Sequence, residues 1–255
     1  MIDLHSHILP NIDDGSKSIS ETYNLIKEAY NAGFTNIIST SHYLEDYDFI
    51  ADDEQRRQWI SLLSQNLPEE VKNIKLHIGS EIYIRYDMLE LLENKKASTL
   101  GDSNYVLFEL SMKHKTSNLK NIIYDLLEQG YIPIIAHPER YKFIQEEPNY
   151  LIELIELGVY FQANFASIIG FYGKEVQNTV KLLLKNNMIH FLGSDVHREN
   201  TIYTKMPEIL KELRKIISEN KLKELTELNP KLVLENKKIY VDSPIEIKKS
   251  FWNKL

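Results

Sequence analysis

The sequence predicts an α/β fold, a closed TIM-like barrel of about seven strand–helix units in a single domain. Short apolar segments alternate with helical segments about seven times, which is typical of parallel strands joined by crossover helices. The 255 residues show no linker and no repeat of fixed period, and α/β barrels of this length are commonly undivided. No Gly-x-Gly-x-x-Gly or phosphate-loop lysine motif indicates an open nucleotide-binding sheet. We therefore expect residues 1–255 to form one barrel.

The first strand carries two histidines in the segment Met-Ile-Asp-Leu-His-Ser-His. His5 and His7 are two residues apart, so in a strand both imidazoles point to the same face and can reach one metal ion. The turn that follows, residues 13–15, supplies carboxylates at the end of this strand. A solvated edge strand with two chance histidines is the alternative interpretation of this segment taken alone.

Strands and helices then alternate along the chain. The apolar segments predict further strands at residues 34–40, 75–81, 105–109, 131–137, 159–164 and 189–194. Helices are expected at residues 18–33, 53–66, 86–95, 117–129, 148–157 and 173–187. Ser18 and Glu21 have the spacing of a capping box at the start of the first helix, and Gly33 ends it. Residues 206–255 are rich in lysine and glutamate, and we expect their helices to pack outside and close the domain.

The composition limits the chemistry of the protein. The chain has no cysteine, which excludes disulfides, thiolate metal sites and a cysteine nucleophile. A metal would therefore be bound by imidazole and carboxylate groups, which suit manganese, iron, zinc or magnesium. The net charge of −7 argues against a nucleic-acid partner, because such binding depends on phosphate neutralisation by lysine and arginine.

The sequence gives no sign of membrane insertion. No apolar run approaches the ~20 residues that span a bilayer. The N-terminus lacks the basic and apolar regions of a signal peptide, because Asp3 and His5 interrupt it. We expect a cytoplasmic protein, and the sequence does not indicate its oligomeric state.

Nine polar residues stand at the carboxyl ends of the predicted strands. They are His5, His7, Asp14, His42, Glu81, Glu109, His137, Asp195 and His197. In α/β barrels this end carries the active site. A helix cap or a satisfied polar group would explain any one of them. Four carboxylates at one rim, however, raise one another's pKa strongly unless cations are present, so the set predicts a metal site.

Other polar and aromatic residues have weaker interpretations. His77 and His190 fall within strands, and we expect them to be core or surface residues. Residues 113–115, Lys-His-Lys, form either a solvated loop or a basic lip beside the site, and Lys113 is a candidate substrate-binding residue. Tyr43 is a second candidate, because rim aromatics either stack on a tyrosine ring or anchor loops. The acidic stretch 45–54 disfavours an acidic peptide on that side.

Six stretches carry a family resemblance. They are Met-Ile-Asp-Leu-His-Ser-His-Ile-Leu-Pro, Ile-Asp-Asp-Gly, Ser-Thr-Ser-His, Gly-Ser-Glu-Ile, Ile-Ile-Ala-His-Pro-Glu-Arg-Tyr and Ser-Asp-Val-His, spread over residues 1–197. The chain resembles the polymerase-and-histidinol-phosphatase (PHP) superfamily, whose members are distorted seven-stranded barrels with a three-metal site. Within it, the chain is most similar to the manganese-dependent bacterial protein-tyrosine phosphatases encoded with capsule and exopolysaccharide genes.

The resemblance implies three divalent ions, manganese first, with iron or zinc as alternatives. It implies one ion bound by His5, His7, Glu81 and Asp195. A second ion would share Glu81 with Glu109 and His137. The third would be bound by Asp14, His42 and His197.

Two arginines are the implied catalytic residues. Arg140 matches an arginine that the family uses on the substrate phosphate. A second family arginine lies several residues after the Asp-x-His motif, but residues 198–203 here have no arginine at that spacing. Arg198 is the candidate replacement, and the alternative is that the second arginine is missing.

The predicted activity is hydrolysis of a phosphomonoester by in-line attack of a metal-bridging hydroxide. The resemblance implies phosphotyrosine as the substrate, on a bacterial tyrosine kinase with a tyrosine-rich tail that regulates capsule synthesis. Phenolate is a tolerable leaving group, since the pKa of tyrosine is ~10. This suits a site for which the sequence offers no evident general acid.

Three alternatives to a tyrosine phosphatase stay open. A phosphatase of the same superfamily would act on histidinol phosphate or another small molecule. A pseudoenzyme scaffold would bind phosphotyrosine without turnover, although the complete set of expected ligands argues against it. An amidohydrolase barrel shares the first-strand His-x-His, but the pair Glu81 and Glu109 fits it poorly.

Overall fold

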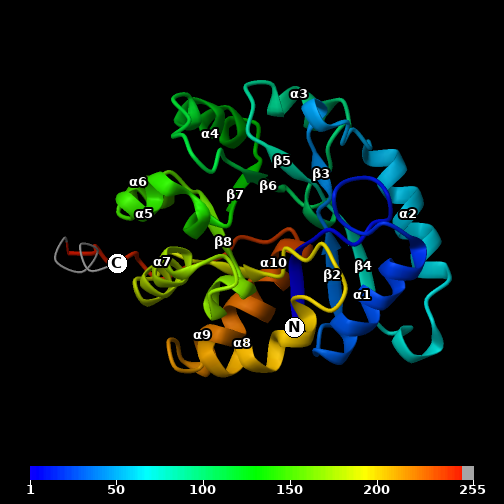
Figure 1. Ribbon diagram of the computed structural model, residues 1–255. Helices are drawn as coiled ribbons and strands as arrows, with labels where there is room; N and C mark the ends of the chain where they lie inside the picture. The colour runs from blue at the N-terminus through cyan, green and yellow to red at the C-terminus, as the bar shows by residue number, and fades with distance from the viewer. Residues whose placement is uncertain (249–255) are drawn as a thin grey trace.

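The computed structural model describes residues 1–248, and its strands lie at the centre with helices around them (Figure 1). The strands are β1 Ile2–Ser6, β2 Asn36–Ser39, β3 His42–Tyr43, β4 Lys75–Ile78, β5 Glu81–Tyr83, β6 Tyr105–Glu109, β7 Ile132–Ala136, β8 Tyr160–Asn164 and β9 Phe191–Gly193. Every ladder between them is parallel. The prediction of a parallel α/β fold is confirmed.

The strands form two sheets, with the orders β1-β2-β4 and β3-β5-β6-β7-β8-β9. Two predicted strands are each interrupted by two residues, so that β2 continues into β3 and β4 into β5. At Gly79, between β4 and β5, a Cβ atom would lie 3.0 Å from side-chain atoms of Ile38 and Leu100. A larger residue here would require these neighbouring side chains to shift.

The two sheets meet at β1. A parallel bridge joins Ser6 to Val196, just after β9, and the Asp195 amide donates a hydrogen bond of 2.8 Å to the His5 carbonyl. Seven chain segments therefore follow one another as in the predicted barrel, but the hydrogen-bond ladder is split between two sheets. The breaks between β2 and β3 and between β4 and β5 therefore distort the barrel, as the family resemblance implied.

The predicted helices are present, most of them with shorter ends. The α-helices of the structure are α1 Ile19–Asn31, α2 Asp53–Gln65, α3 Met88–Glu93, α4 Leu119–Glu128, α5 Lys142–Glu146, α6 Tyr150–Glu156, α7 Lys174–Lys185, α8 Met206–Leu213, α9 Glu219–Lys223 and α10 Asn229–Leu234. The short helix α5 was not predicted. Among residues 1–248, no helix combines the length and the apolar character needed to cross a membrane.

The predicted cap of α1 is present in a modified form. The Ser18 hydroxyl accepts a hydrogen bond of 3.1 Å from the Glu21 amide. The Glu21 carboxylate accepts one from the Lys17 amide rather than from Ser18. Two amides at the start of the helix are thus satisfied, as in a capping box shifted by one residue.

The barrel interior is filled by apolar side chains below the rim. Leu4, Ile38, Leu107, Ile134 and Phe191, from five different strands, belong to one fully buried cluster. Val233 of α10 and Ile239 join this cluster and close the base. Residues 206–234 contain the helices α8, α9 and α10, whereas 235–248 form no helix or strand and 249–255 lie outside the described residues, so the closure of the domain by 206–255 stays a prediction.

Candidate metal centre

The nine predicted ligands lie at or beyond the carboxyl ends of the strands. They come from the end of β1 (His5, His7), the β1–α1 loop (Asp14), the end of β6 (Glu109), the residue after β7 (His137) and the segment after β9 (Asp195, His197). His42 and Glu81 are the first residues of the short strands β3 and β5, just beyond the carboxyl ends of β2 and β4. Parallel strands point the same way, so their carboxyl ends meet at one rim. The structure brings all nine together.

A first cluster is completely buried and contains His5, His7, Glu81 and Asp195. The Nε2 atoms of His5 and His7 lie 3.1 Å apart. Glu81 Oε2 lies 3.1 Å from His5 Nε2 and 3.3 Å from His7 Nε2. Asp195 Oδ1 lies 3.4 and 3.5 Å from the same two nitrogens. Four ligand atoms thus surround one small volume.

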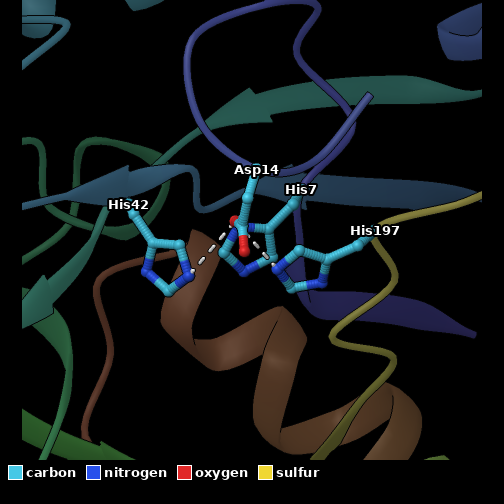
Figure 2. Close-up of side chains that lie close together, drawn as sticks. All are labelled: His7, Asp14, His42 and His197. Atoms are coloured by element: carbon cyan, nitrogen blue, oxygen red, sulfur yellow. Dashed lines mark ion pairs between the residues drawn. The ribbon is translucent and has the colours of Figure 1, made fainter. Parts of the chain in front are cut away.

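A second cluster lies at the outer side of the rim, where His7, His42 and His197 face Asp14 (Figure 2). Asp14 Oδ1 lies 3.3 Å from His197 Nε2 and 3.7 Å from His42 Nε2. The rings of His7 and His197 stack with centroids 4.0 Å apart. This set contains the three residues implied for the third ion and adds His7.

A third group involves both oxygens of Glu81 together with Glu109. His137 Nε2 lies 3.0 Å from Glu81 Oε1 and 3.8 Å from Glu109 Oε2. His42 Nδ1 lies 3.2 Å from Glu81 Oε2 and 3.6 Å from Glu109 Oε1. Glu81 therefore stands between all the imidazoles except that of His197, as a bridging carboxylate would.

The electrostatics of the rim show strong coupling between the acids. Burial, together with the charges of Glu81 and Asp195, raises the pKa of Glu109 to about 9. Burial alone would also raise the pKa of Glu81, but the imidazoles of His5 and His42 hold it well below its usual range. The carboxylates are too close to be ionised together without neighbouring positive charge.

The donor set fits divalent cations. The Gln162 amide oxygen lies 2.6 Å from His5 Nδ1, and the Asp13 carboxylate lies 2.9 Å from His7 Nδ1. Both partners accept hydrogen bonds, so each neutral imidazole is assigned its proton at Nδ1 and a lone pair at Nε2. These lone pairs converge with the carboxylates of Glu81 and Asp195, an arrangement that a bound cation stabilises.

Strand β8 contributes none of the predicted ligands, yet it supports two of them. The Gln162 amide donates to Asn164 Oδ1 at 2.9 Å, and Asn164 Nδ2 donates to Asp195 Oδ2 at 2.7 Å. With the Gln162–His5 contact, these bonds form a chain between His5 and Asp195. At Gly193 a Cβ atom would lie 2.7 Å from His5 Cβ and 2.9 Å from Gln162 Nε2, so only glycine permits this packing.

The sequence analysis missed these supporting residues, because a buried glutamine or asparagine in a strand has no distinctive motif. The available signal was that Gln162 and Asn164 are two residues apart at a strand end, and therefore on the same face. Asp13 is a further supporting residue, since its carboxylate also accepts the His42 amide at 2.9 Å. Its neighbour in the sequence, Asp14, faces the Nε2 atoms of His42 and His197 instead.

Two of the rim residues have left-handed backbone conformations. The φ angles are 35° at His137 and 52° at Asp195. Such angles are uncommon for residues other than glycine and cost about 1–3 kcal/mol each. The surrounding structure therefore holds these two side chains toward the rim at the expense of local stability.

The two predicted arginines have different surroundings. Arg140 Nη1 lies 3.0 Å from Asp195 Oδ2, and its guanidinium group lies 4.7 Å from the centre of the Tyr172 ring. Arg198 donates to the backbone carbonyls of Gly15 and His197. Both arginines border the metal centre, and their catalytic roles stay predictions.

The other sequence candidates lie farther from the clusters. Tyr43 is buried, and its hydroxyl donates to Glu45 at 3.1 Å, while Lys113 is exposed in the loop after β6. Their roles in substrate binding stay predictions. His77 lies in β4 and pairs with Asn36, and His190 is buried just before β9, so both are placed as expected.

Comparisons with known proteins agree with this geometry. The family model described as "Capsular polysaccharide synthesis, CpsB/CapC" matches residues 1–235. The putative tyrosine-protein phosphatase CapC of Staphylococcus aureus is 33% identical over 252 residues, covering 96% of each chain. The tyrosine-protein phosphatase YwqE of Bacillus subtilis is 33% identical over 251 residues, covering 98% of this chain and 97% of its own.

Solved structures show the same relationship. A crystal structure from a study of YwqE from Bacillus subtilis and CpsB from Streptococcus pneumoniae, described as metal-dependent tyrosine phosphatases, superposes with a TM-score of 0.88 at 31% identity, covering 98% of this chain and 100% of that one. A histidinol phosphate phosphatase from Lactococcus lactis shares the fold, with a TM-score of 0.58 at 15% identity over 85% of this chain and 94% of that one. The chain belongs to the CpsB/CapC family of capsular polysaccharide synthesis proteins.

Proposed function

We propose that this protein is a metal-dependent protein-tyrosine phosphatase that binds three divalent ions, manganese in the first place. The observation that carries the proposal is the convergence of four imidazoles, those of His5, His7, His42 and His137, on the two oxygens of Glu81, in a chain whose relatives are named tyrosine-protein phosphatases. The proposed ligand sets are the three implied by the PHP resemblance.

Bound divalent ions would supply a nucleophile at neutral pH and neutralise charge on the phosphoryl group. The protein residues bind and orient the substrate. Arg140 has spare donors in addition to the one directed at Asp195, so it can bind a phosphoryl oxygen while Asp195 and the Tyr172 ring hold its guanidinium group in place. Asp195 thereby connects the ligand set to the phosphate-binding arginine.

The leaving group limits what the protein must provide. A phenolate leaves with a conjugate acid pKa of ~10, so hydrolysis of phosphotyrosine needs less help from a general acid than hydrolysis of an alkyl phosphate. We propose a phosphotyrosine protein as the substrate, and a tyrosine kinase of the capsule system with a tyrosine-rich tail as the specific partner.

The test is steady-state turnover of the manganese-loaded protein on a phosphotyrosine peptide and on histidinol phosphate, with a chelated sample as control. We expect kcat/KM to be higher for the peptide by at least about tenfold and activity to be lost on chelation. Preference for histidinol phosphate would make the protein a small-molecule phosphatase. No turnover of either substrate with metal bound would favour a binding scaffold.

A further inference from the structure

A groove of about 490 Å³ lies beside the metal centre, between the β1–α1 loop, the segment before α2 and α2 itself. Its lining includes Asn11, Ile12, Asp48, Ile50, Trp59 and Leu62. None of these residues belongs to the ligand set. The groove is therefore a surface feature separate from the candidate metal ligands.

The groove is directly connected to the rim. Asn11 and Ile12 immediately precede the Asp13–Asp14 pair, and the Phe49 ring stacks on His42 with centroids 6.2 Å apart. Arg56 of α2 is fully buried and donates to the carbonyl of His42 at 3.1 Å and to the carbonyl of Ala51 in the groove wall. A chain leaving the metal centre on this side would enter the groove within a few residues, at roughly 3.3–3.6 Å per residue.

The groove surface combines exposed apolar side chains with polar ones such as Gln55 and Gln58. Ile50 is 55% exposed and Leu62 is 47% exposed, and the partly buried Trp59 lies between them in the lining. Two large apolar side chains open beside an indole ring are suited to cover an apolar side chain of a bound segment.

The segment that borders the groove is strongly acidic. Residues 43–55 contain six acids and no lysine or arginine. Glu45 pairs with Arg85, and Asp53 pairs with Arg57. Within the described part of the chain, the other four acids of the segment, Asp46, Asp48, Asp52 and Glu54, form no ion pair. Asp48 lines the groove itself, and these four acids outnumber the one buried guanidinium behind the wall, that of Arg56, which donates to backbone carbonyls.

We propose that this groove binds the polypeptide segment that flanks the phosphotyrosine, and that it selects an apolar side chain together with a lysine or arginine. The inference rests on the proposed function, because it assumes that the phosphotyrosine occupies the metal centre. Charge complementarity decides the class of partner: the acidic border attracts a basic segment and repels an acidic one. A small phosphorylated metabolite would not reach the groove.

The test compares two phosphotyrosine peptides. Both carry a leucine on each side of the phosphotyrosine. The residues next to the leucines are lysines in one peptide and glutamates in the other. We expect kcat/KM to be at least about fivefold higher for the lysine peptide at low ionic strength, with the preference declining as salt is added. The double variant D46N/D48N should lose most of this preference. D125N/E128Q, at two exposed positions of α4, is the control for the same change of two units in net charge.

The apolar part of the groove is tested by Leu62→Ala. We expect about a threefold to fivefold fall in kcat/KM for the lysine peptide, with no change in hydrolysis of p-nitrophenyl phosphate, which is too small to reach the groove. Leu228→Ala is the matched control, because Leu228 is 48% exposed and does not line the groove. Equal kcat/KM for both peptides in the native protein, or a parallel loss on p-nitrophenyl phosphate in the Leu62 variant, would overturn the proposal.

Failure of the proposed function gives a different result. If the metal-loaded protein hydrolyses neither peptide nor p-nitrophenyl phosphate, the catalytic assignment is wrong. Fluorescence anisotropy of the two labelled peptides then still tests the groove, since tighter binding of the lysine peptide that depends on Asp46 and Asp48 would support it. Equal binding of the two peptides would reject it.

Discussion

The two ends of the barrel use buried histidine in opposite ways. At the rim, burial alone would lower the pKa of His5, but the neighbouring carboxylates outweigh it and raise the pKa to about 9. At the base, His190 packs against Tyr160 and Phe161, and burial, with a smaller effect of Lys221, lowers its pKa to about 3. Both side chains are excluded from water, so burial alone does not define a functional histidine. The difference lies in the acids that share the rim.

The largest effect is expected when the shared carboxylate is removed. Glu81→Ala takes away the group that lies between the clusters, so we expect turnover and bound metal to be lost together. His5→Ala and Asp195→Ala should behave similarly. Activity assays and metal analysis by mass spectrometry measure both quantities, with Glu128→Ala on the exposed end of α4 as the control. Full activity in the Glu81 variant would refute the site.

A smaller loss is expected when Arg140, the proposed phosphate-binding residue, is replaced and the metal ligands are left in place. Arg140→Ala should lower kcat/KM by about 10²–10³, the usual effect of losing one donor to a developing oxyanion, while the metal content is unchanged. Arg198→Ala is the comparison. A loss of similar size would identify Arg198 as the second arginine, and unchanged kinetics would remove it from the mechanism.

The supporting amides of β8 should have an intermediate effect on metal binding. Gln162→Leu removes the acceptor for His5 Nδ1, and we expect metal affinity to fall by about 10–100-fold. Asn229→Leu at the base is a matched loss of a buried amide, because Asn229 donates to the His190 carbonyl at 2.9 Å. It should lower stability without changing the affinity of the folded protein for manganese, as measured by calorimetric titration.

The base histidine predicts a dependence of stability on pH. His190 is neutral when folded, because its pKa is about 3, whereas in the unfolded chain it binds a proton below about pH 6.5. Stability is therefore full above pH 6.5 and falls as the pH decreases, by about 2 kcal/mol between pH 7.5 and 5. Urea unfolding at several pH values gives the free energy of unfolding of the native protein and of His190→Asn. The contribution of His190 is the difference between the slopes of these two free energies against pH. Equal slopes would show that His190 does not titrate on unfolding.

The sequence predicted where the candidate metal ligands lie, but it did not predict the residues that hydrogen-bond to them. Strand alternation placed the polar residues at one rim, because the carboxyl ends of parallel strands share an edge. It did not reveal that β8 supplies an amide chain, since Gln162 and Asn164 become partners of His5 and Asp195 only when distant strands come together. The breaks between β2 and β3 and between β4 and β5 also depend on tertiary contacts, such as those at Gly79.

The central claim is that the acids and imidazoles of the rim are a metal centre. The most direct test is a crystal structure of the protein grown with manganese, with diffraction data collected at the manganese absorption edge. We predict three anomalous peaks, two of them in contact with the Glu81 carboxylate and one beside Asp14, His42 and His197. Saturating manganese without an anomalous peak at Glu81 would contradict the account.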